Sequence, residues 1–377
     1  MKHAYSTILI LLMTFSAIVT VESCKDKDQP PVQEEKPLSP VALKLDTLLT
    51  NLQNPWGLEF LPDGSILIAE KSGKLLKYKD GSTVEITGLP VISASGQGGL
   101  MDLALHKDFE NNGRLYFSAS VNGATSISTA LFMAKINGNQ LENVQKLFQA
   151  DPQTSSTLHF GSRIVLKDGY VYLCLGERND PPQAQNTSNH SGCVIRMHDD
   201  GRIPDDNPYN GKSGFKDEIW TYGHRNPQGM ALNPKNGEIW LHEHGPKGGD
   251  EINILKKGGN YGWPLASFGV NYNGSTITPD TFVDGTILPI YYWVPSIAPC
   301  GMTFYNSDVI PQWKGNLFLG ALAGNHLNRL EISGNKVAKE ERLLQNQGRF
   351  RVVKQGRDGF LYFATETPGR LYRYRPL

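Results

Sequence analysis

Six short stretches of one pattern decide the fold: GSILI (64–68), GRLYF (113–117), GYVYL (169–173), GEIWL (237–241), GNLFL (315–319) and GFLYF (359–363). Each begins with a glycine that ends a turn, and apolar or aromatic residues follow. Another short apolar run precedes each copy, at 57–61, 100–105, 163–166, 229–232, 301–305 and 351–353. Two such runs around a glycine turn predict an antiparallel hairpin.

A third apolar run follows most copies, at 75–78, 131–136, 194–197, 252–255, 327–332 and 371–374. The repeated unit is therefore a meander of three or four strands. Amphipathic helical periods are absent, which predicts an all-β chain. Radial repetition of such units predicts a six-bladed β-propeller of four-stranded antiparallel blades, with a β-sandwich as the alternative. The segment 41–49, left over before the first hairpin, is expected to complete the last blade beside 371–374.

Composition narrows the class of function. The 377 residues contain 37 Lys and Arg and 37 Asp and Glu, so the formal net charge is zero, which argues against a nucleic-acid partner. The 39 glycines and 23 prolines fit a globular chain rich in turns. Beyond the N-terminus, no apolar run approaches the roughly 20 residues of a membrane-spanning helix.

The N-terminus has the pattern of an export signal. Lys2 and His3 precede an apolar run at 8–21, and a polar, proline-rich stretch follows at 25–40. We therefore expect a signal peptide at 1–24 that ends at a lipoprotein cysteine, Cys24, then a flexible tether at 25–40 and the propeller at 41–377. This predicts an exported protein, either periplasmic or an outer-membrane lipoprotein that meets the membrane only through its lipid anchor. Cys24 as an unlipidated thiol is the alternative.

The ring of blades predicts where polar residues meet. In a propeller the first strand of each blade lines the central channel, so residues just before these strands converge on one channel mouth. They are Asn54, Trp56, Gln97, His159, Arg225, Asn226, Pro299, Arg349 and Arg351. The ends of the second strands add Glu70, Glu177, the segment 244–246 and Glu366. Several arginines at one rim predict an anionic, oxygen-rich ligand, because arginine binds carboxylates in a bidentate manner.

The segment LHEHGPKGGDE (241–251) concentrates polar groups and glycines at a strand end. Backbone carbonyls and carboxylates are ligands that Ca²⁺ prefers. His242 and His244 share a strand face, so a histidine-bound metal is conceivable, but no third imidazole or thiolate has suitable spacing. A long loop between blades, stiffened by glycine and proline, is the alternative.

Five motifs in this order resemble those of the glucose/sorbosone dehydrogenase family, from about Leu52 to the C-terminus. They are HFGSR (159–163), YGHRNPQGMALNP (222–234), EHGPKGGDEIN (243–253), NYGWP (260–264) and PSIAPCGMTFY (295–305). The resemblance implies a sugar dehydrogenase that uses pyrroloquinoline quinone (PQQ) and Ca²⁺ on a six-bladed propeller. It would oxidise the C1 hydroxyl of aldose sugars to lactones and pass electrons to an unidentified quinone or cytochrome.

The resemblance also implies residue roles. His159 matches the general base that takes the C1 hydroxyl proton while hydride passes to PQQ. Gln97 matches a residue near sugar and cofactor, and Asp250 a carboxylate that positions the site. The positions that match PQQ contacts are Arg225, Asn226, Arg349 and Arg351, with Arg225 also stabilising charge on the quinone.

The metal positions are likewise implied by the resemblance. Gly245 and Pro246 match carbonyl ligands of the cofactor Ca²⁺, and Glu251 and Tyr261 match a second, structural Ca²⁺ site. Four positions depart from the family pattern. Val352 stands in place of an aspartate, Ala323 in place of a lysine found in some members, Cys193 in place of a common lysine, and Glu177 in place of an aspartate.

The sequence is also compatible with two other functions. One is a propeller lactonase that uses a channel Ca²⁺, which would require several carboxylates at the channel centre. The other is a non-catalytic binding propeller that has lost PQQ.

Overall fold

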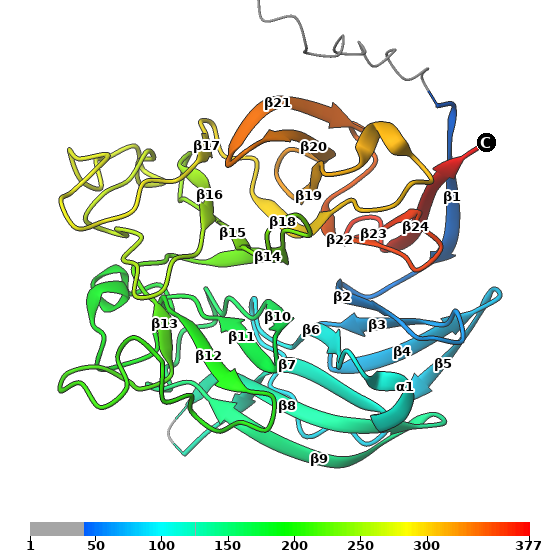
Figure 1. Cartoon of the computed structure of the whole chain (residues 1–377), viewed down its shortest axis with the longest axis horizontal. Helices are drawn as coiled ribbons and strands as arrows, with labels where there is room; N and C mark the ends of the chain where they lie inside the picture. The colour runs from blue at the N-terminus through cyan, green and yellow to red at the C-terminus, as the bar shows by residue number, and fades with distance from the viewer. Residues whose placement is uncertain (1–40, 125) are drawn as a thin grey trace, which may run out of the picture. The chain divides into compact units, whose positions relative to one another are not determined.

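Each hairpin lies in a separate four-stranded antiparallel sheet, and six such sheets surround a central channel (Figure 1). The computed structural model describes residues 41–124 and 126–377. The six-bladed β-propeller is therefore confirmed. The signal peptide at 1–24, the lipoprotein cysteine Cys24 and the tether at 25–40 lie outside the described residues.

The strands of each blade follow the chain from the channel outward. The first blade holds β2 (Pro55–Phe60), β3 (Ile66–Glu70), β4 (Lys74–Lys79) and β5 (Ser82–Ile86). The second holds β6 (Leu100–Leu105), β7 (Arg114–Asn122), β8 (Ile127–Asn137) and β9 (Gln140–Gln149). The third holds β10 (Ile164–Lys167), β11 (Tyr170–Cys174), β12 (Val194–His198) and β13 (Ile219–Thr221).

The remaining blades repeat this order. The fourth holds β14 (Pro227–Leu232), β15 (Ile239–Glu243), β16 (Asp250–Ile254) and β17 (Tyr291–Trp293). The fifth holds β18 (Pro299–Phe304), β19 (Leu317–Ala321), β20 (His326–Ser333) and β21 (Lys336–Leu343). The last holds β22 (Phe350–Gln355), β23 (Leu361–Thr365), β24 (Arg370–Pro376) and β1 (Leu43–Thr50). Helical turns are limited, within the described ranges, to α1 (Phe109–Asn112), η1 (Pro181–Gln185) and η2 (Pro311–Trp313).

Apolar side chains fill the wedges between neighbouring blades. One cluster joins the first and second blades through residues such as Leu67 and Phe117, and equivalent clusters lie at the other five interfaces. The six inner strands β2, β6, β10, β14, β18 and β22 contact one another in that cyclic order. Burial between blades therefore holds the inner strands around the channel.

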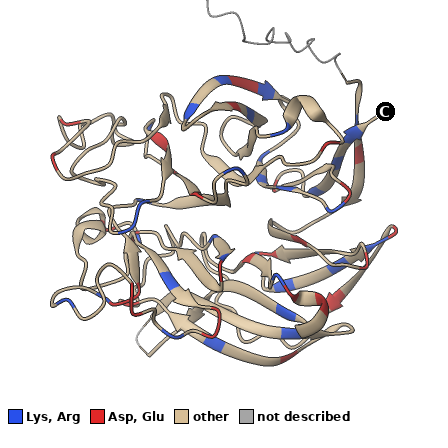
Figure 2. Ribbon diagram, viewed as in Figure 1, with Lys and Arg blue, Asp and Glu red and all other residues tan. Residues whose placement is uncertain are grey.

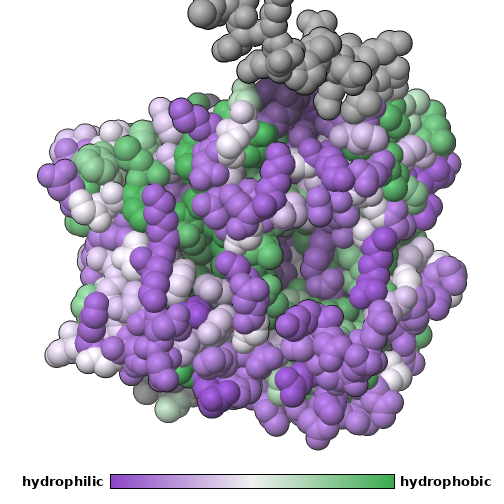
Figure 3. All heavy atoms as spheres, viewed as in Figure 1, coloured by the Kyte–Doolittle hydropathy of each residue, from purple (hydrophilic) through white to green (hydrophobic). Residues whose placement is uncertain are grey.

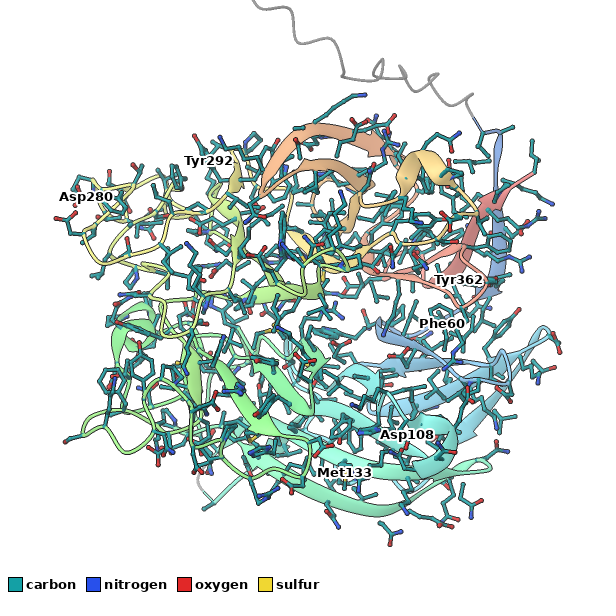
Figure 4. The ribbon with its side chains drawn as sticks, viewed as in Figure 1. Phe60, Asp108, Met133, Asp280, Tyr292 and Tyr362 are labelled. Carbon is teal, nitrogen blue, oxygen red and sulfur yellow. The ribbon has the colours of Figure 1, made fainter. Side chains whose placement is uncertain are left out.

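The N-terminal strand closes the ring, as expected from the sequence. β1 pairs with β24 in antiparallel register, from Leu43 opposite Pro376 to Thr50 opposite Arg370. Phe60 of the first blade and Tyr362 of the last pack edge to face at 4.9 Å between ring centroids (Figure 4). Strand pairing and side-chain packing thus join the two ends of the repeat array.

A β-bulge lies at the mouth end of several inner strands. The register shifts between Pro55 and Gly57, Pro227 and Gly229, Cys300 and Met302, and Phe350 and Val352. One residue is left unpaired in each: Trp56, Gln228, Gly301 and Arg351. Bulges bend a strand and redirect a side chain. These four bulges therefore shape the channel mouth.

Positive and negative residues are mixed over the described part of the protein. Lysine and arginine are interspersed with aspartate and glutamate around the ribbon (Figure 2). Polar residues cover most of the face in Figure 3, and hydrophobic residues gather around its hollow centre. In the part of the chain that the structure describes, no helix has the length and apolar character needed to cross a bilayer. The cysteines Cys174, Cys193 and Cys300 are buried free thiols.

Candidate functional site

A cavity of about 300 Å³ opens at the end of the channel where the inner strands begin. Eight of the residues expected at this rim line it: Asn54, Trp56, Gln97, Asn226, His244, Arg349, Arg351 and Glu366. These eight come from four blades, and Phe160 of the third blade with Ala298 and Leu322 of the fifth complete the lining. Residues of all six blades thus meet at one mouth, although they are up to 312 positions apart in sequence, from 54 to 366.

His159 does not itself line this cavity, but it directly precedes Phe160 and Gly161, which do, and fixed partners hold it there. Its Nδ1 lies 2.6 Å from Oε2 of Glu177, and its backbone N–H donates to Oε1 of Gln97 at 2.8 Å. The residue is 5% exposed and adopts a left-handed backbone conformation with φ of 51°. No hydrogen bond to Nε2 is present within the described ranges. The ring therefore has one anchored and one available nitrogen.

The backbone around His159 is fixed by close contacts. A Cβ on Gly176 would lie 2.2 Å from the carbonyl oxygen of His159, so only glycine fits there. Arg178 donates to the carbonyl of Leu158 at 2.5 Å and lies over the Phe160 ring at 3.5 Å. The residues on both sides of His159 are thus tied to the end of the third blade's second strand.

Positive charge dominates the opposite side of the cavity. Arg351 donates to Oε1 of Glu366 at 2.6 Å and to Oε1 of Gln228 at 3.0 Å, and Arg349 lies 3.5 Å from the same carboxylate. The two arginines hold the pKa of Glu366 below its usual value, although burial alone would raise it. Lys71 also lines the cavity. Three cations against one carboxylate leave the mouth cationic.

Arg225 and Asn226 lie at the fourth blade. The Arg225 guanidinium donates to the carbonyls of His244 at 3.0 Å and Gly245 at 3.1 Å. Asn226 lines the cavity, and its Oδ1 accepts from the side chain of Gln228 at 3.1 Å. Arg225 is 6% exposed; it lines not the mouth cavity but a small neighbouring cavity that Gly245 and Glu251 also line.

Asp250 acts on the loop that carries Gly245. Its Oδ1 accepts from the Gly245 N–H at 3.0 Å, and its Oδ2 accepts from Ser296 at 2.7 Å and from the Ile297 and Ala298 N–H groups at 2.8 and 2.9 Å. Burial raises its pKa, while these four donors favour the charged form. These hydrogen bonds tie the Gly245 loop to the segment before β18, so Asp250 positions the backbone of the site.

Glu251 and Tyr261 lie in a separate small cavity beside the fourth blade. The Tyr261 hydroxyl donates to the Ile254 carbonyl at 2.7 Å and accepts from the Lys256 N–H at 2.8 Å. Burial, and then the nearby Glu243, raise the pKa of Glu251 well above its usual value. A buried carboxylate with a weak donor, Asn253 at 3.4 Å, is a place where a cation would be favourable.

Histidine-bound metal finds no support here. Nε2 of His242 lies 3.0 Å from the Gly301 carbonyl and Nε2 of His244 lies 2.7 Å from the Pro299 carbonyl, so each ring donates to backbone. Burial lowers the pKa of His242 to about 3, which keeps it neutral. Over residues 41–124 and 126–377, no group of three or more His, Cys, Asp or Glu side chains could hold a metal ion.

Sequence reasoning missed several residues of the site. Lys71, Met101, Phe160 and Gln228 line the cavity without having been expected there. Glu177 was expected only as a rim carboxylate, whereas it anchors His159. Phe160 stands inside the HFGSR motif and Gln228 inside YGHRNPQGMALNP, and that was the available signal.

Comparison with known proteins assigns the family. A family model described as glucose/sorbosone dehydrogenase matches residues 52–373. The chain belongs to this family. Aldose sugar dehydrogenase YliI of Escherichia coli (strain K12) is 42% identical over 349 residues, which cover 90% of this chain and 94% of that protein. Quinoprotein glucose dehydrogenase B of Acinetobacter calcoaceticus is 34% identical over 288 residues, covering 68% of this chain and 59% of its own length.

Solved structures of the glucose/sorbosone dehydrogenase family share the fold. The apo-form of the soluble aldose sugar dehydrogenase of Escherichia coli superposes with a TM-score of 0.86 at 41% identity, over 89% of this chain and 100% of the other. The PQQ-bound aldose sugar dehydrogenase of Streptomyces coelicolor gives a TM-score of 0.73 at 26% identity, over 89% and 99%. This chain is therefore a member of a family of sugar oxidoreductases.

Proposed function

We propose that this chain oxidises the C1 hydroxyl of aldose sugars to the lactone, with PQQ as electron acceptor and His159 as general base. The observation that carries the proposal is the anchoring of His159, whose Nδ1 lies on Glu177, immediately before two residues that line a cationic cavity, Phe160 and Gly161. Family membership and the PQQ-bound relative support the same reaction.

The hydrogen bond to Glu177 selects the tautomer that a base needs. A carboxylate accepts, so Nδ1 carries the proton and the lone pair lies on Nε2. When Nε2 takes up the hydroxyl proton of the sugar, the ring becomes a cation next to the Glu177 carboxylate, which stabilises it. Such a base contributes on the order of 10² to 10⁴ in rate.

The cavity fits a compact, multiply charged anion such as PQQ. Arg349, Arg351 and Lys71 supply the positive side, and Gln97 and Asn226 supply neutral polar groups. Arg349 and Arg351 would hold the carboxylates. Arg225 lines the neighbouring small cavity, and it would stabilise negative charge on a quinone oxygen that reached its guanidinium. When bound, PQQ supplies the quinone that accepts the hydride from C1.

Oxygen groups next to the cavity fit a hard cation. Gly245 with Pro246 would supply carbonyl oxygens to a cofactor Ca²⁺. The Gly245 carbonyl accepts from the Arg225 guanidinium at 3.1 Å, so it would exchange this donor for the cation. Glu251 and the Tyr261 segment would hold a second, structural Ca²⁺ in their own cavity, where Glu251 is buried without a strong donor.

Val352 and Ala323, two of the departures from the family pattern, do not line the mouth cavity. Val352 belongs to the hydrophobic cluster between the last and first blades, and it is 4% exposed. Ala323 donates its N–H to the Ile297 carbonyl at 3.1 Å, and its neighbour Leu322 lines the cavity instead. Val352 therefore does not support the alternative in which the propeller has lost PQQ binding.

The residues at the mouth do not provide the metal ligands that the lactonase alternative requires. It needs several carboxylates that hold a Ca²⁺ at the channel centre. Among the described residues that line the mouth cavity, Glu366 is the one carboxylate, and it already forms ion pairs with Arg349 and Arg351.

We further propose an aldose as substrate, a quinone or cytochrome as final acceptor, and export to the periplasm or outer membrane through the N-terminal segment.

The test is aldose oxidation by the apoprotein with an artificial electron acceptor, with and without PQQ and Ca²⁺. We expect activity only when both are present. A protein that binds PQQ at micromolar concentration but oxidises no aldose would overturn the proposed reaction. A protein that neither oxidises aldoses nor binds PQQ would overturn the cofactor as well, and a lactone-hydrolysis assay would then separate the two alternatives.

A further inference from the structure

Arg163 uses every donor of its guanidinium inside the channel. Its Nε donates to the carbonyl of Gln228 at 2.8 Å. One terminal nitrogen, Nη1, donates to the Trp56 carbonyl at 3.3 Å and to Oδ1 of Asp102 at 3.1 Å. The other, Nη2, donates to the Arg351 carbonyl at 3.1 Å and to Sγ of Cys300 at 3.7 Å. A guanidinium has five N–H donors, and here five acceptors take them.

The five acceptors belong to five different blades. Trp56 lies in β2, Asp102 in β6, Gln228 in β14, Cys300 in β18 and Arg351 in β22. Arg163 itself immediately precedes β10, the inner strand of the remaining blade. One side chain therefore contacts the inner strand of every other blade of the ring.

Three of these acceptors are carbonyls freed by bulges. Trp56, Gln228 and Arg351 are the unpaired residues of the bulges in β2, β14 and β22. A buried carbonyl without a partner is costly, so each needs a donor. The carbonyl of each residue turns inward to Arg163, while all three residues line the mouth cavity. The same guanidinium thus fixes the backbone from which three lining residues project.

Arg163 also stands between two cavities. A second cavity of about 320 Å³ lies at the far end of the channel, and Arg163 lines it with Asp102, whereas it does not line the mouth cavity. The guanidinium packs 3.8 Å from the Trp56 ring centroid, directly behind that mouth residue. Arg163 is 3% exposed, so it forms part of the floor that separates the two ends.

We propose that Arg163 is a positioning residue that sets the shape of the mouth by holding the three bulges, and that it closes the floor of the site. These contacts require the planar guanidinium group of arginine, which has donors on three nitrogens. Lysine has three donors on one nitrogen and cannot reach acceptors on five blades. The proposal rests on the proposed function only for the identity of the ligand that the mouth binds.

The experiment compares Arg163→Lys and Arg163→Met with Arg196→Met, a matched loss of a buried arginine in the same blade. Arg196 is 4% exposed and pairs with Asp206 at 2.8 Å, and it lies on β12, away from the mouth. Backbone hydrogen exchange is measured on each apoprotein. For both Arg163 variants we expect amides at 56–57, 228–229 and 350–352 to exchange about tenfold faster or more, and no such local change for Arg196→Met.

A second readout is PQQ binding and turnover. We expect the dissociation constant for PQQ to rise at least about tenfold in Arg163→Lys, with a smaller fall in kcat at saturating PQQ. Unchanged exchange in the three bulges, or equal acceleration in all three variants, would overturn the positioning role. So would failure of both Arg163 variants to fold, which would assign Arg163 to stability alone. Wild type that binds no PQQ would overturn the proposed function and leave the exchange result standing.

Discussion

Glu177 and His159 form a 2.6 Å hydrogen bond between Oε2 and Nδ1, and both side chains are buried. Oε2 of Glu177 also accepts the Asn179 N–H at 2.7 Å, so the carboxylate itself is fixed. A fixed acceptor at Nδ1 leaves Nε2 as the only basic atom of the ring. The orientation of the proposed base thus depends on the end of β11.

Replacing this carboxylate with an amide is expected to remove catalysis and spare the fold. In Glu177→Gln the amide N–H₂ can donate to Nδ1, which favours the wrong tautomer, so kcat falls by about 10² to 10⁴. Steady-state sugar oxidation at saturating PQQ measures the loss. The control is Glu218→Gln, which alters a comparable histidine–carboxylate pair, His190 and Glu218 at 3.3 Å, away from the mouth. Equal losses in both variants would remove the specific role of Glu177.

Arg349 is expected to contribute binding energy for the cofactor. It lines the cavity, and its side chain is 45% exposed, so Arg349→Gln leaves folding intact. Loss of a charge-assisted hydrogen bond costs about 1.5 to 3 kcal/mol, which raises the dissociation constant for PQQ about 10- to 100-fold. Equilibrium titration measures the change. Arg357→Gln, an exposed pair with Glu110, is the control, and an unchanged constant in Arg349→Gln would contradict the prediction.

Gly176 is expected to admit no side chain. A Cβ there would lie 2.2 Å from the His159 carbonyl and 3.1 Å from Oδ1 of Asn226, so Gly176→Ala must move the His159 loop. We expect kcat to fall at least about tenfold, together with a loss of stability of about 1 to 3 kcal/mol from overpacking. Gly138→Ala is the control for a loss of stability away from the site: its φ of 60° disfavours alanine, but nothing lies within 4 Å of its Cβ position, so kcat should not change. A fully active Gly176→Ala enzyme would show that the loop adapts.

The strand that closes the ring predicts a pH-dependent stability. Asp46 on β1 accepts from Arg375 at 2.6 Å and from Arg373 at 2.9 Å on β24, and the hydrogen bond with Arg375 is the main cause that lowers its pKa from 3.8 to about 2. A lowered folded-state pKa stabilises the fold above the ordinary pKa, and this stabilisation is lost as the pH falls toward 2.

Asp46→Asn is therefore expected to lower the free energy of unfolding by about 1 kcal/mol at pH 7, a size typical of partly exposed pairs. The difference from wild type should shrink between pH 4 and pH 2. Denaturant unfolding at several pH values measures it, with Asp308→Asn as a control, since Asp308 pairs with nearby Lys314 on the surface. A difference that stays constant down to pH 2 would contradict the assignment to Asp46.

The inner parts of the fold were predictable from the sequence, and the outer parts were not. The two inner strands of each blade are mostly buried; in β3, for example, every residue is buried. Buried strands require apolar residues, so they appear in the sequence as apolar runs on either side of a glycine turn. The outer strands give no such signal: β5 is exposed at four of five positions, and β17 has three residues after a long insertion. Their pairing comes from the sheet edge beside them, which no local pattern records.

The site was predictable in its location more than in its contacts. Placing residues before inner strands brought Gln97, Arg349 and Arg351 to one cavity. The bulges were not visible, because an extra residue in a strand depends on pairing with its partner. The role of Arg163 was equally hidden, since its five acceptors lie on five separate blades.

The measurement that tests the central claim most directly is anaerobic reduction of bound PQQ by an aldose, in wild type and in His159→Gln. Both proteins are first loaded with PQQ and Ca²⁺, and the absorbance of the quinone is followed after sugar is added. We predict equal PQQ binding in both, rapid reduction in wild type, and reduction slowed by at least about 10² in His159→Gln. Equally fast reduction in the two proteins would contradict His159 as the base, and no reduction in wild type would contradict the sugar dehydrogenase itself.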